Sequence, residues 1–415
     1  MSLIPSASRV LLLAAVSLVA APALAFQPTG NPAADQFLAN AEAGGWEAVT
    51  IGQVTGDDQE IVLQNVAAQI TVDMTPPAPE PQSPGEAAEA EKQPAPQPVS
   101  ETINLAVDRI TLTGPGLDAN GRRTFTSVVY NGFVMASPES RTTVRLGRTE
   151  GVTLLNPEQI AGATKGPGTT VTLFNRLTAE DTVVSPDGGV PVTVRDMRME
   201  NSAFTDSFPT ASKVSATGIQ VPTEALEPDV RARLKSIGYD TLSFGFDASW
   251  NWDAATGTLN LPSLAVSGAS MGRLDFSAVV GGVTDENVRA MQSGDPQTTM
   301  GLLQNMTVKS AKLRFDNQSI VERLIEYSAK DQGVTRDVLV GQLTAALPML
   351  LQPVQNAAFS AEVSKAVGEF LRQPRSLTIS VAPQNPTPFF QILGLAAMAP
   401  QTIPQALQLT VTANE

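Results

Sequence analysis

Residues 241–283 constrain the fold most, because apolar and polar side chains alternate there with few interruptions. The first run is apolar at every second position: Leu242, Phe244, Phe246, Ala248, Trp250 and Trp252. Successive side chains of a strand point to opposite faces, so this run predicts a strand with one apolar and one polar face. Alternation resumes after the loop Asp253–Gly257, changes phase near Pro262 and breaks at 268–272. We therefore expect three antiparallel strands in a meander.

The N-terminus has the pattern of a secretory signal peptide. Arg9 precedes an apolar stretch, Val10–Ala20, which is too short to span a bilayer, and Ala23-Leu24-Ala25 is a small-x-small cleavage site. We expect cleavage after Ala25, which makes residues 1–25 a signal peptide and the mature protein periplasmic; an uncleaved anchor helix is the alternative. Because no cysteine can accept a lipid anchor, we expect a soluble exported protein with no integral membrane segment in its mature chain.

The chain contains neither cysteine nor histidine. This excludes disulfides, thiol catalysis, thiolate and imidazole metal sites, and the Ser-His-Asp triad. Carboxylate pairs, Ser-Lys dyads, tyrosine and lysine remain as candidate catalysts. The formal net charge of −14 argues against nucleic acid as a partner, because the phosphate backbone carries the same sign.

Residues 26–74 are expected to form a helix and the first strands. Asn31 and Pro32 suit a helix start, and Gly44-Gly45 suits its end. Residues 61–72 alternate with a change of phase near Asn65, which indicates a bulge or bend.

Residues 75–100 break the pattern, because prolines alternate with glutamate, alanine and glutamine. Such a composition cannot bury enough apolar surface to offset the entropy of ordering, so it predicts a disordered loop. Strand-like runs flank it on both sides, which favours an insertion in a hairpin over the alternative of a linker between two domains.

Residues 101–305 are expected to continue the antiparallel meander. Besides residues 241–283, strand-like runs lie at 103–107, 124–136, 142–155, 169–174, 190–199 and 214–221. Turn sequences such as Pro186-Asp-Gly-Gly189 separate these runs.

Residues 306–415 are expected to add helices to the same β-rich domain. After a strand at 306–315, helices are predicted at Ser319–Gln332, Thr335–Gln352 and Ser360–Arg372, with strands again at 377–381 and 407–413. Ser319 and Glu322 have the spacing of a capping box, while Thr335 and Ser360 are the expected caps of the next two helices. Pro348 should kink or end the second helix.

Several blocks resemble uncharacterised exported proteins of Gram-negative bacteria. They are Ser249-Trp-Asn-Trp-Asp253 with Thr256-Gly257-Thr-Leu-Asn-Leu-Pro, Gly272-Arg-Leu-Asp-Phe with Gly281-Gly-Val283, and the ending Phe370-Leu-Arg-Gln-Pro374. More distantly the chain resembles the AsmA-like envelope proteins, and this resemblance implies a long β-rich structure between two membranes. Unlike those proteins, this chain is expected to lack a retained membrane anchor.

One candidate metal site lies at the loop after the first strand of residues 241–283. Asp253, Asn251 and Thr256 supply oxygens for calcium, yet an EF-hand needs more oxygens and a bidentate glutamate. Turn chemistry explains these residues better.

Two candidate catalytic groups are the adjacent carboxylates Asp57-Asp58 and Glu180-Asp181. Neighbours on a strand point to opposite faces, so we expect solvated loops rather than a glycoside-hydrolase pair. Ser263 and Ser267 have no lysine placed to activate them. The sequence therefore assigns no catalytic, cofactor-binding or metal-ligating residue.

The apolar run Phe389–Ala399 is too short to cross a bilayer. Core packing is the main expectation, and contact with a membrane or an apolar ligand is the alternative. Basic residues, which favour membrane contact, do not flank the run.

The expected fold is α+β and mainly β: an elongated, curved antiparallel sheet with a C-terminal group of three helices. The expected function is non-enzymatic, an envelope protein that binds an apolar, lipid-like molecule or a partner protein on one sheet face. Two alternatives remain, a structural envelope component and a carboxylate-dependent hydrolase of cell-wall glycans. Only 3 Trp and 3 Tyr are present, which favours an apolar groove over a sugar platform.

Overall fold

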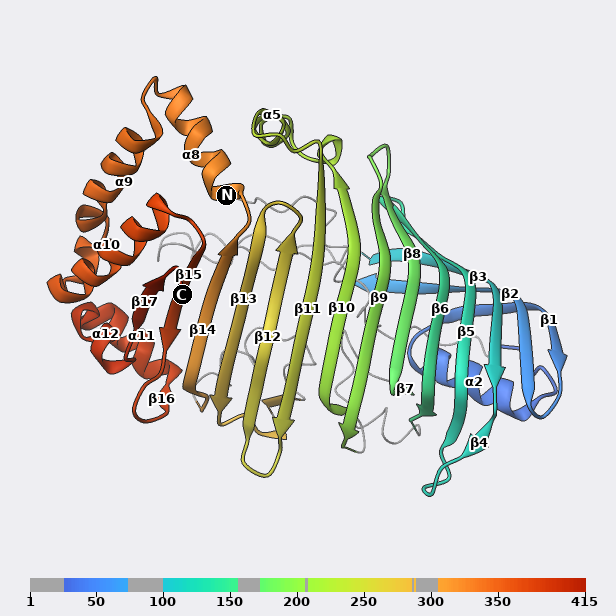
Figure 1. The fold of residues 1–415 in the computed structure, drawn as a ribbon. Helices are drawn as coiled ribbons and strands as arrows, with labels where there is room; N and C mark the ends of the chain where they lie inside the picture. The colour runs from blue at the N-terminus through green and yellow to red at the C-terminus, as the bar shows by residue number, and fades with distance from the viewer. Residues whose placement is uncertain (1–25, 74–99, 156–171, 206–207, 286, 289–304) are drawn as a thin grey trace, which may run out of the picture.

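A computed structural model describes residues 26–73, 100–155, 172–205, 208–285, 287–288 and 305–415. Its main feature is one open, curved antiparallel sheet whose long strands follow one another in chain order (Figure 1). These strands are β1 (Glu47–Gly56), β2 (Glu60–Asp73), β3 (Ser100–Thr113), β5 (Arg123–Ala136), β6 (Ser140–Leu154), β8 (Arg176–Pro186), β9 (Val192–Phe204), β10 (Pro209–Pro222), β11 (Thr241–Asp253), β12 (Thr258–Gly268), β13 (Gly272–Gly281), β14 (Thr307–Asn317), β15 (Ser376–Val381) and β17 (Thr410–Ala413). The predicted meander is confirmed.

Short strands and helices complete the described part of the chain. The short strands β4 (Gly116–Leu117), β7 (Thr172–Leu173) and β16 (Thr387–Pro388) pair with β5, β6 and β14. The helices are α2 (Pro32–Ala43), α5 (Pro228–Ser236), α8 (Ile320–Asp331), α9 (Arg336–Leu350), α10 (Ala357–Arg372), α11 (Phe389–Met398) and α12 (Ile403–Ala406), with 3-10 turns η2 (Thr223–Ala225), η3 (Gln352–Val354) and η4 (Pro400–Thr402). The expected C-terminal helices are present, whereas the sequence did not predict α5, α11 or α12.

The N-terminal end of the sheet is covered by helix α2 (Figure 1). The Asn31 side chain caps this helix by accepting hydrogen bonds from the backbone N–H groups of Ala33 and Ala34, as predicted. Phe37 of α2 meets Phe125 of β5 edge to face, with ring centroids 6.1 Å apart. Beneath the helix lie the fully buried side chains of the sheet, among them Leu63, Ile110, Leu112 and Val128. We call this region, α2 with β1 to β6, the covered end.

The hairpin of β2 and β3 frames the proline-rich segment. The two strands pair from Glu60 opposite Thr113 to Asp73 opposite Ser100, so residues 74–99 connect neighbouring strands. The predicted disorder of residues 75–100 and the signal peptide at 1–25 lie outside the described residues, apart from Ser100, which begins β3. Within β2, Asn65 has a positive φ of 52°, which confirms the predicted irregularity.

The C-terminal helices depart from prediction at their starts. Ser319 precedes α8 but makes no capping bond; instead the side-chain amide oxygen of Asn317 accepts from the Val321 N–H, so the predicted capping box is wrong. Asn356 caps α10 by accepting from the Phe359 N–H, which places the cap four residues before the predicted Ser360. Thr335 caps α9 as predicted.

Candidate functional site: an apolar track across the sheet

Two rows of side chains cross nine strands on one face of the sheet, and every member is apolar. Directly paired residues of antiparallel strands share a face, so the pairing of the strands defines each row. The first row is Ala179, Met197, Ala216, Phe246, Val266, Leu274, Phe315, Leu377 and Ala413. The second row is Leu177, Met199, Val214, Ala248, Leu264, Phe276, Leu313, Ile379 and Val411. With strands about 4.8 Å apart, the rows extend for about 38 Å. We call them together the apolar track.

Part of this track is exposed. The most exposed of its large side chains, at 36% to 46% of their surface, are Leu264, Val266, Leu274, Leu313 and Ile379. They are neighbours on β12, β13, β14 and β15, and Phe276 and Phe315 beside them are half-buried. We call this part the open stretch. A contiguous exposed apolar surface of this kind is typical of an interaction site.

Helix α10 closes the C-terminal end of the open stretch. Its Phe370 meets Phe315 of the track edge to face, with ring centroids 6.2 Å apart. Val411, the last member of the second row, is buried on β17, which α10 contacts. The track is therefore capped at this end and exposed on β12 to β15.

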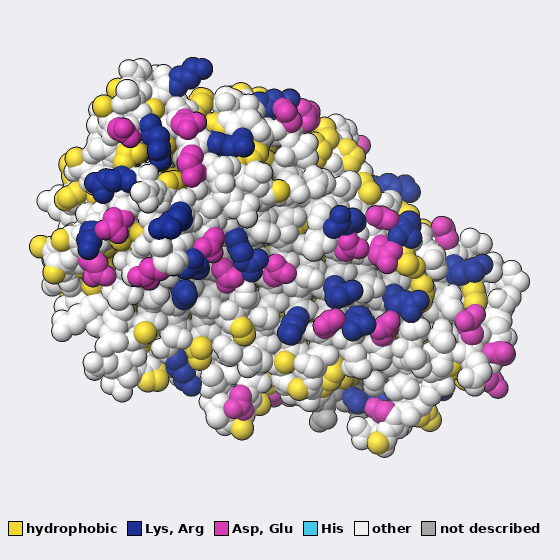
Figure 2. All heavy atoms as spheres, in the orientation of Figure 1, with side chains coloured by type: hydrophobic (Ala, Val, Ile, Leu, Met, Phe, Trp, Pro, Cys, Tyr) yellow, Lys and Arg dark blue, Asp and Glu magenta, His cyan; other side chains and the backbone are white. Residues whose placement is uncertain are grey.

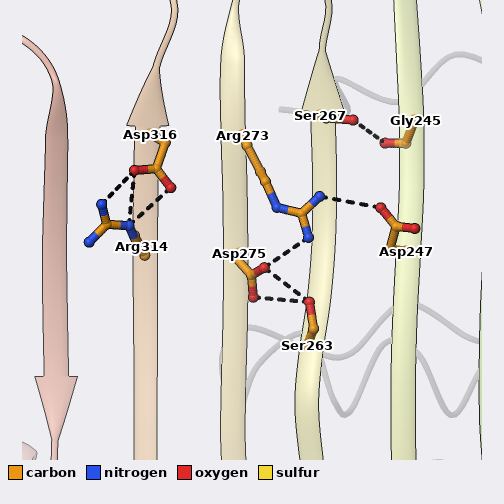
Figure 3. Close-up of polar contacts among 8 residues, drawn as sticks. All are labelled: Gly245, Asp247, Ser263, Ser267, Arg273, Asp275, Arg314 and Asp316. Carbon is orange, nitrogen blue, oxygen red and sulfur yellow. Dashed lines mark hydrogen bonds and ion pairs between the residues drawn. The ribbon is translucent and has the colours of Figure 1, made fainter.

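The opposite face of the same strands carries ion pairs. Figure 2 shows this face, where basic and acidic side chains alternate in a band across its middle. In Figure 3, Arg273 donates to Asp247 at 3.3 Å and to Asp275 at 3.0 Å, and Arg314 pairs with Asp316 at 2.7 Å. Hydrogen bonding to the Asp316 carboxylate raises the pKa of Arg314. The two faces of the sheet thus have opposite chemistry, as the alternation at 241–283 predicts.

The candidate serines are held in structural hydrogen bonds. The Ser263 hydroxyl donates to the Asp275 carboxylate at 3.0 Å, and the Ser267 hydroxyl donates to the Gly245 carbonyl at 3.4 Å (Figure 3). Among the hydrogen bonds of the described residues, neither hydroxyl is paired with a lysine.

The candidate carboxylate pairs are engaged by neighbouring groups. The Asp57 carboxylate accepts from the backbone N–H groups of Gln59 and Glu60, and these bonds lower its pKa. Glu180 and Asp181, however, lie in strand β8 and not in a loop, and both carboxylates bind Arg145. Asp181 has a positive φ of 49°, so a local irregularity brings two sequence neighbours to the same side. The expectation of opposite faces was wrong for this pair.

Asp253 closes its own turn. Its carboxylate accepts from the Thr256 hydroxyl at 2.8 Å and from the backbone N–H groups of Ala255 and Thr256. The bond from the Thr256 hydroxyl is the main cause of the lowered pKa of Asp253. These bonds match the turn interpretation. Among the described residues, no group of three or more acidic side chains could hold a metal ion.

A hollow of about 830 Å³ lies at one end of strands β6 to β12. Its lining includes Glu150, Arg176, Glu200, Lys213 and Trp250. Arg176 pairs with Glu150 at 3.5 Å and with Glu200 at 3.3 Å, so both carboxylates are engaged by the same guanidinium. The arrangement joins β6, β8 and β9 electrostatically and does not present two carboxyl groups to a sugar ring.

Helix α9 and the 3-10 turn after it contain an apolar segment. By length and composition alone, Arg336–Val354 is apolar enough to cross a membrane. Only 11% of its apolar 18-residue stretch is buried in the structure. Leu339 and Val340 are buried against α8, and Pro348 lies inside the helix, which ends two residues later. Helix α11, in turn, has no fully buried residue. Phe389 at its start is partly buried and packs against the core cluster that contains Phe208 and Trp252, so the expected core packing of Phe389–Ala399 holds at its first residue but not along the exposed remainder of the helix.

Comparison with known proteins adds one similarity. Residues 265–414 match the model of a family described as "Uncharacterized protein". The matched segment runs from within β12 to just past β17, so it includes most of the open stretch and all the C-terminal helices. No curated protein matches the sequence.

Proposed function

We propose that this protein binds the hydrocarbon part of a lipid-like molecule on the open stretch, without catalysing a reaction. The observation that carries the proposal is the apolar track, in which eighteen paired positions hold no polar or charged side chain. Covering apolar surface stabilises a complex by about 25 cal/mol per Å². An extended hydrocarbon chain suits such a surface because it needs no hydrogen-bonding partner.

The proposed location is the periplasm, after removal of residues 1–25. Its support is the sequence pattern alone: Arg9, the short apolar core and the cleavage site ending at Ala25. The intact mass of protein recovered from the periplasm tests it. A mature chain that begins at Phe26 is expected, and one that retains residues 1–25 would contradict the proposal.

Support for a binding role over hydrolysis comes from the candidate catalysts. Glycoside hydrolysis needs two carboxyl groups placed on either side of the scissile bond. Glu180 and Asp181 share Arg145, while Asp57 and Asp253 accept hydrogen bonds from their own turns. Ion pairs and hydrogen bonds within the protein therefore already occupy these carboxylates.

The test compares one substitution at two similarly exposed valines. Val266 in the open stretch is 46% exposed and Val230 on α5 is 41% exposed. We expect Val266→Asp to weaken the binding of a fluorescent fatty acid by at least about tenfold, equal to about 1.4 kcal/mol, because a carboxylate would have to be desolvated. Val230→Asp should leave the affinity unchanged. Equal affinity of both variants and the parent protein would contradict the proposal.

Native mass spectrometry of protein purified from its own compartment supplies an independent measurement. Copurified lipid that is lost in Val266→Asp is the expected result. Lipid-free protein that also fails to bind the fatty acid would favour the structural role, and copurification of a protein held by Val266 would favour a protein partner.

A further inference from the structure

The end of the molecule beyond β17 carries a second exposed apolar surface, separate from the track. Met349 and Leu350 at the end of α9 and Met398 at the end of α11 are the most exposed large apolar side chains described, up to 88% for Met398. Phe390 and Leu393 on α11 are also exposed. We call these five residues the apolar tip.

Several contacts hold the two helices of the tip together. The turn η3, which follows α9, contacts η4, which follows α11. The Asn356 side-chain amide donates to the Gln401 carbonyl at 3.0 Å and so links the same two segments. In Figure 1, helices α9 to α12 lie together at one end of the sheet. The tip is therefore one surface, built from residues about 50 positions apart in the chain.

This surface is free of charge, in a protein whose formal net charge is −14. No Asp, Glu, Lys or Arg occurs in residues 338–361, which contain most of α9 and the start of α10. None occurs in residues 376–414, which contain β15, α11, α12 and β17. In Figure 2 the surface over α11 and α12, at the lower left, shows no charged side chain. Burying this surface would therefore desolvate no ion.

We propose that the apolar tip inserts into the surface of a lipid bilayer with uncharged or zwitterionic head groups. The absence of charge determines the type of lipid head group. Without lysine or arginine the tip has no attraction for anionic lipids, and these lipids repel the negatively charged protein as a whole. A protein partner is the competing occupant, because Phe and Met, which the tip contains, are also enriched at protein interfaces; flotation of the isolated protein distinguishes the two.

The helices lie on the bilayer and do not span it. Leu339 and Val340 in the first half of α9 are buried against α8, so moving the whole segment Arg336–Val354 into a membrane would expose that core. The second half of α9 has no fully buried residue, and Met349 and Leu350 at its end are exposed. Immersion by one layer of side chains is the geometry of an interfacial helix.

This inference goes beyond the proposed binding on the open stretch and depends on different residues, so either can fail alone. The experiment is flotation of the full chain with phosphatidylcholine vesicles. The double variant Leu350→Asp, Met398→Asp is expected to lose at least about tenfold in vesicle affinity. Its matched control is Leu117→Asp on β4, since Leu117 and Leu350 are 62% and 68% exposed at opposite ends of the sheet. The control should bind vesicles as the parent does.

Salt and lipid composition supply the second readout. Binding should not weaken with added salt and should not strengthen when phosphatidylglycerol replaces part of the phosphatidylcholine. Stronger binding to the anionic vesicles would overturn the proposal, because it would require a basic surface elsewhere. Failure of the parent protein to float would overturn it as well, as would a dimer in sedimentation that Leu350→Asp dissociates, which would assign the tip to a second copy.

Fatty-acid binding and vesicle flotation, measured on both variants, distinguish the two proposals. The tip variant should retain the parent's affinity for the fluorescent fatty acid, and Val266→Asp should retain flotation. A variant that loses both activities together with its folded circular-dichroism spectrum would be replaced by Leu350→Ser, Met398→Ser, for which the same loss of flotation is expected.

Discussion

The covered end and the open stretch have the same alternation of apolar and polar residues along their strands, but the apolar side chains are buried in the first region and exposed in the second. Leu112 on β3 and Leu274 on β13 both alternate with polar neighbours, and both lie in rows of paired apolar side chains. Leu112 is fully buried because α2 lies over its face, whereas Leu274 is 45% exposed. Alternation therefore determines which side chains share a face, while the element placed over that face determines whether they form a core or an exposed apolar surface.

The largest expected difference is in the stability lost when each of these leucines is shortened. Leu112→Ala removes methyl groups from a closed core and should lower the free energy of unfolding by about 2–5 kcal/mol. Leu274→Ala removes partly solvated groups and should cost less than about 1 kcal/mol. Urea denaturation followed by circular dichroism measures both. Equal losses would show that the open stretch is packed as tightly as the covered end.

Removing a helix cap should lower the stability by a smaller amount, and by a similar amount at the two ends of the sheet. Asn31→Ala at α2 and Asn356→Ala at α10 each remove a side-chain acceptor from the first helical turn, and each should cost about 0.5–2 kcal/mol. Ser360→Ala, at the residue that the sequence predicted as the cap of α10, should change stability by less than about 0.5 kcal/mol. A loss at Ser360 as large as that at Asn356 would contradict the cap seen in the structure.

Much of the fold could be predicted from the sequence, because strands and helix starts are encoded locally. The three strands of residues 241–283, the helix after Asn31 and the irregularity at Asn65 all lie where the pattern indicates. Strand β8 was missed because Glu180-Asp181 has the composition of a loop. Asp181, with its positive φ, is left out of the pairing with both β6 and β9, and no local rule indicates this irregularity.

The candidate site could be predicted only in part. The sequence indicates an apolar face and allows a ligand on it, but the rows of the track depend on the pairing of nine strands and on which helices cover them. Local pattern likewise suggested a core position for Phe389–Ala399, because an apolar run has the same composition in a core and on an exposed surface. Only the tertiary arrangement distinguishes the two.

The smallest expected effect concerns two hairpin turns, one in each region. Asp57 precedes β2 in the covered end and Asp253 ends β11 beside the open stretch, and both have a lowered pKa. For Asp57 the main cause is the backbone N–H of Gln59, and for Asp253 it is the Thr256 hydroxyl. Thr256→Val should therefore raise the pKa of Asp253 towards its ordinary value and leave that of Asp57 unchanged. Carboxyl titration by NMR measures both values.

The sign of the accompanying stability change follows from the direction of these pKa shifts. A carboxylate whose pKa is lowered on folding stabilises the protein above its unfolded-state pKa, and this contribution is lost as the pH falls through the lower, folded-state pKa. In Thr256→Val the part due to Asp253 should shrink, so the variant should lose less stability between neutral and acidic pH than the parent does. If the pKa of Asp57 moved together with that of Asp253, the two turns would be coupled through the sheet, and the covered end and the open stretch could no longer be treated as independent regions.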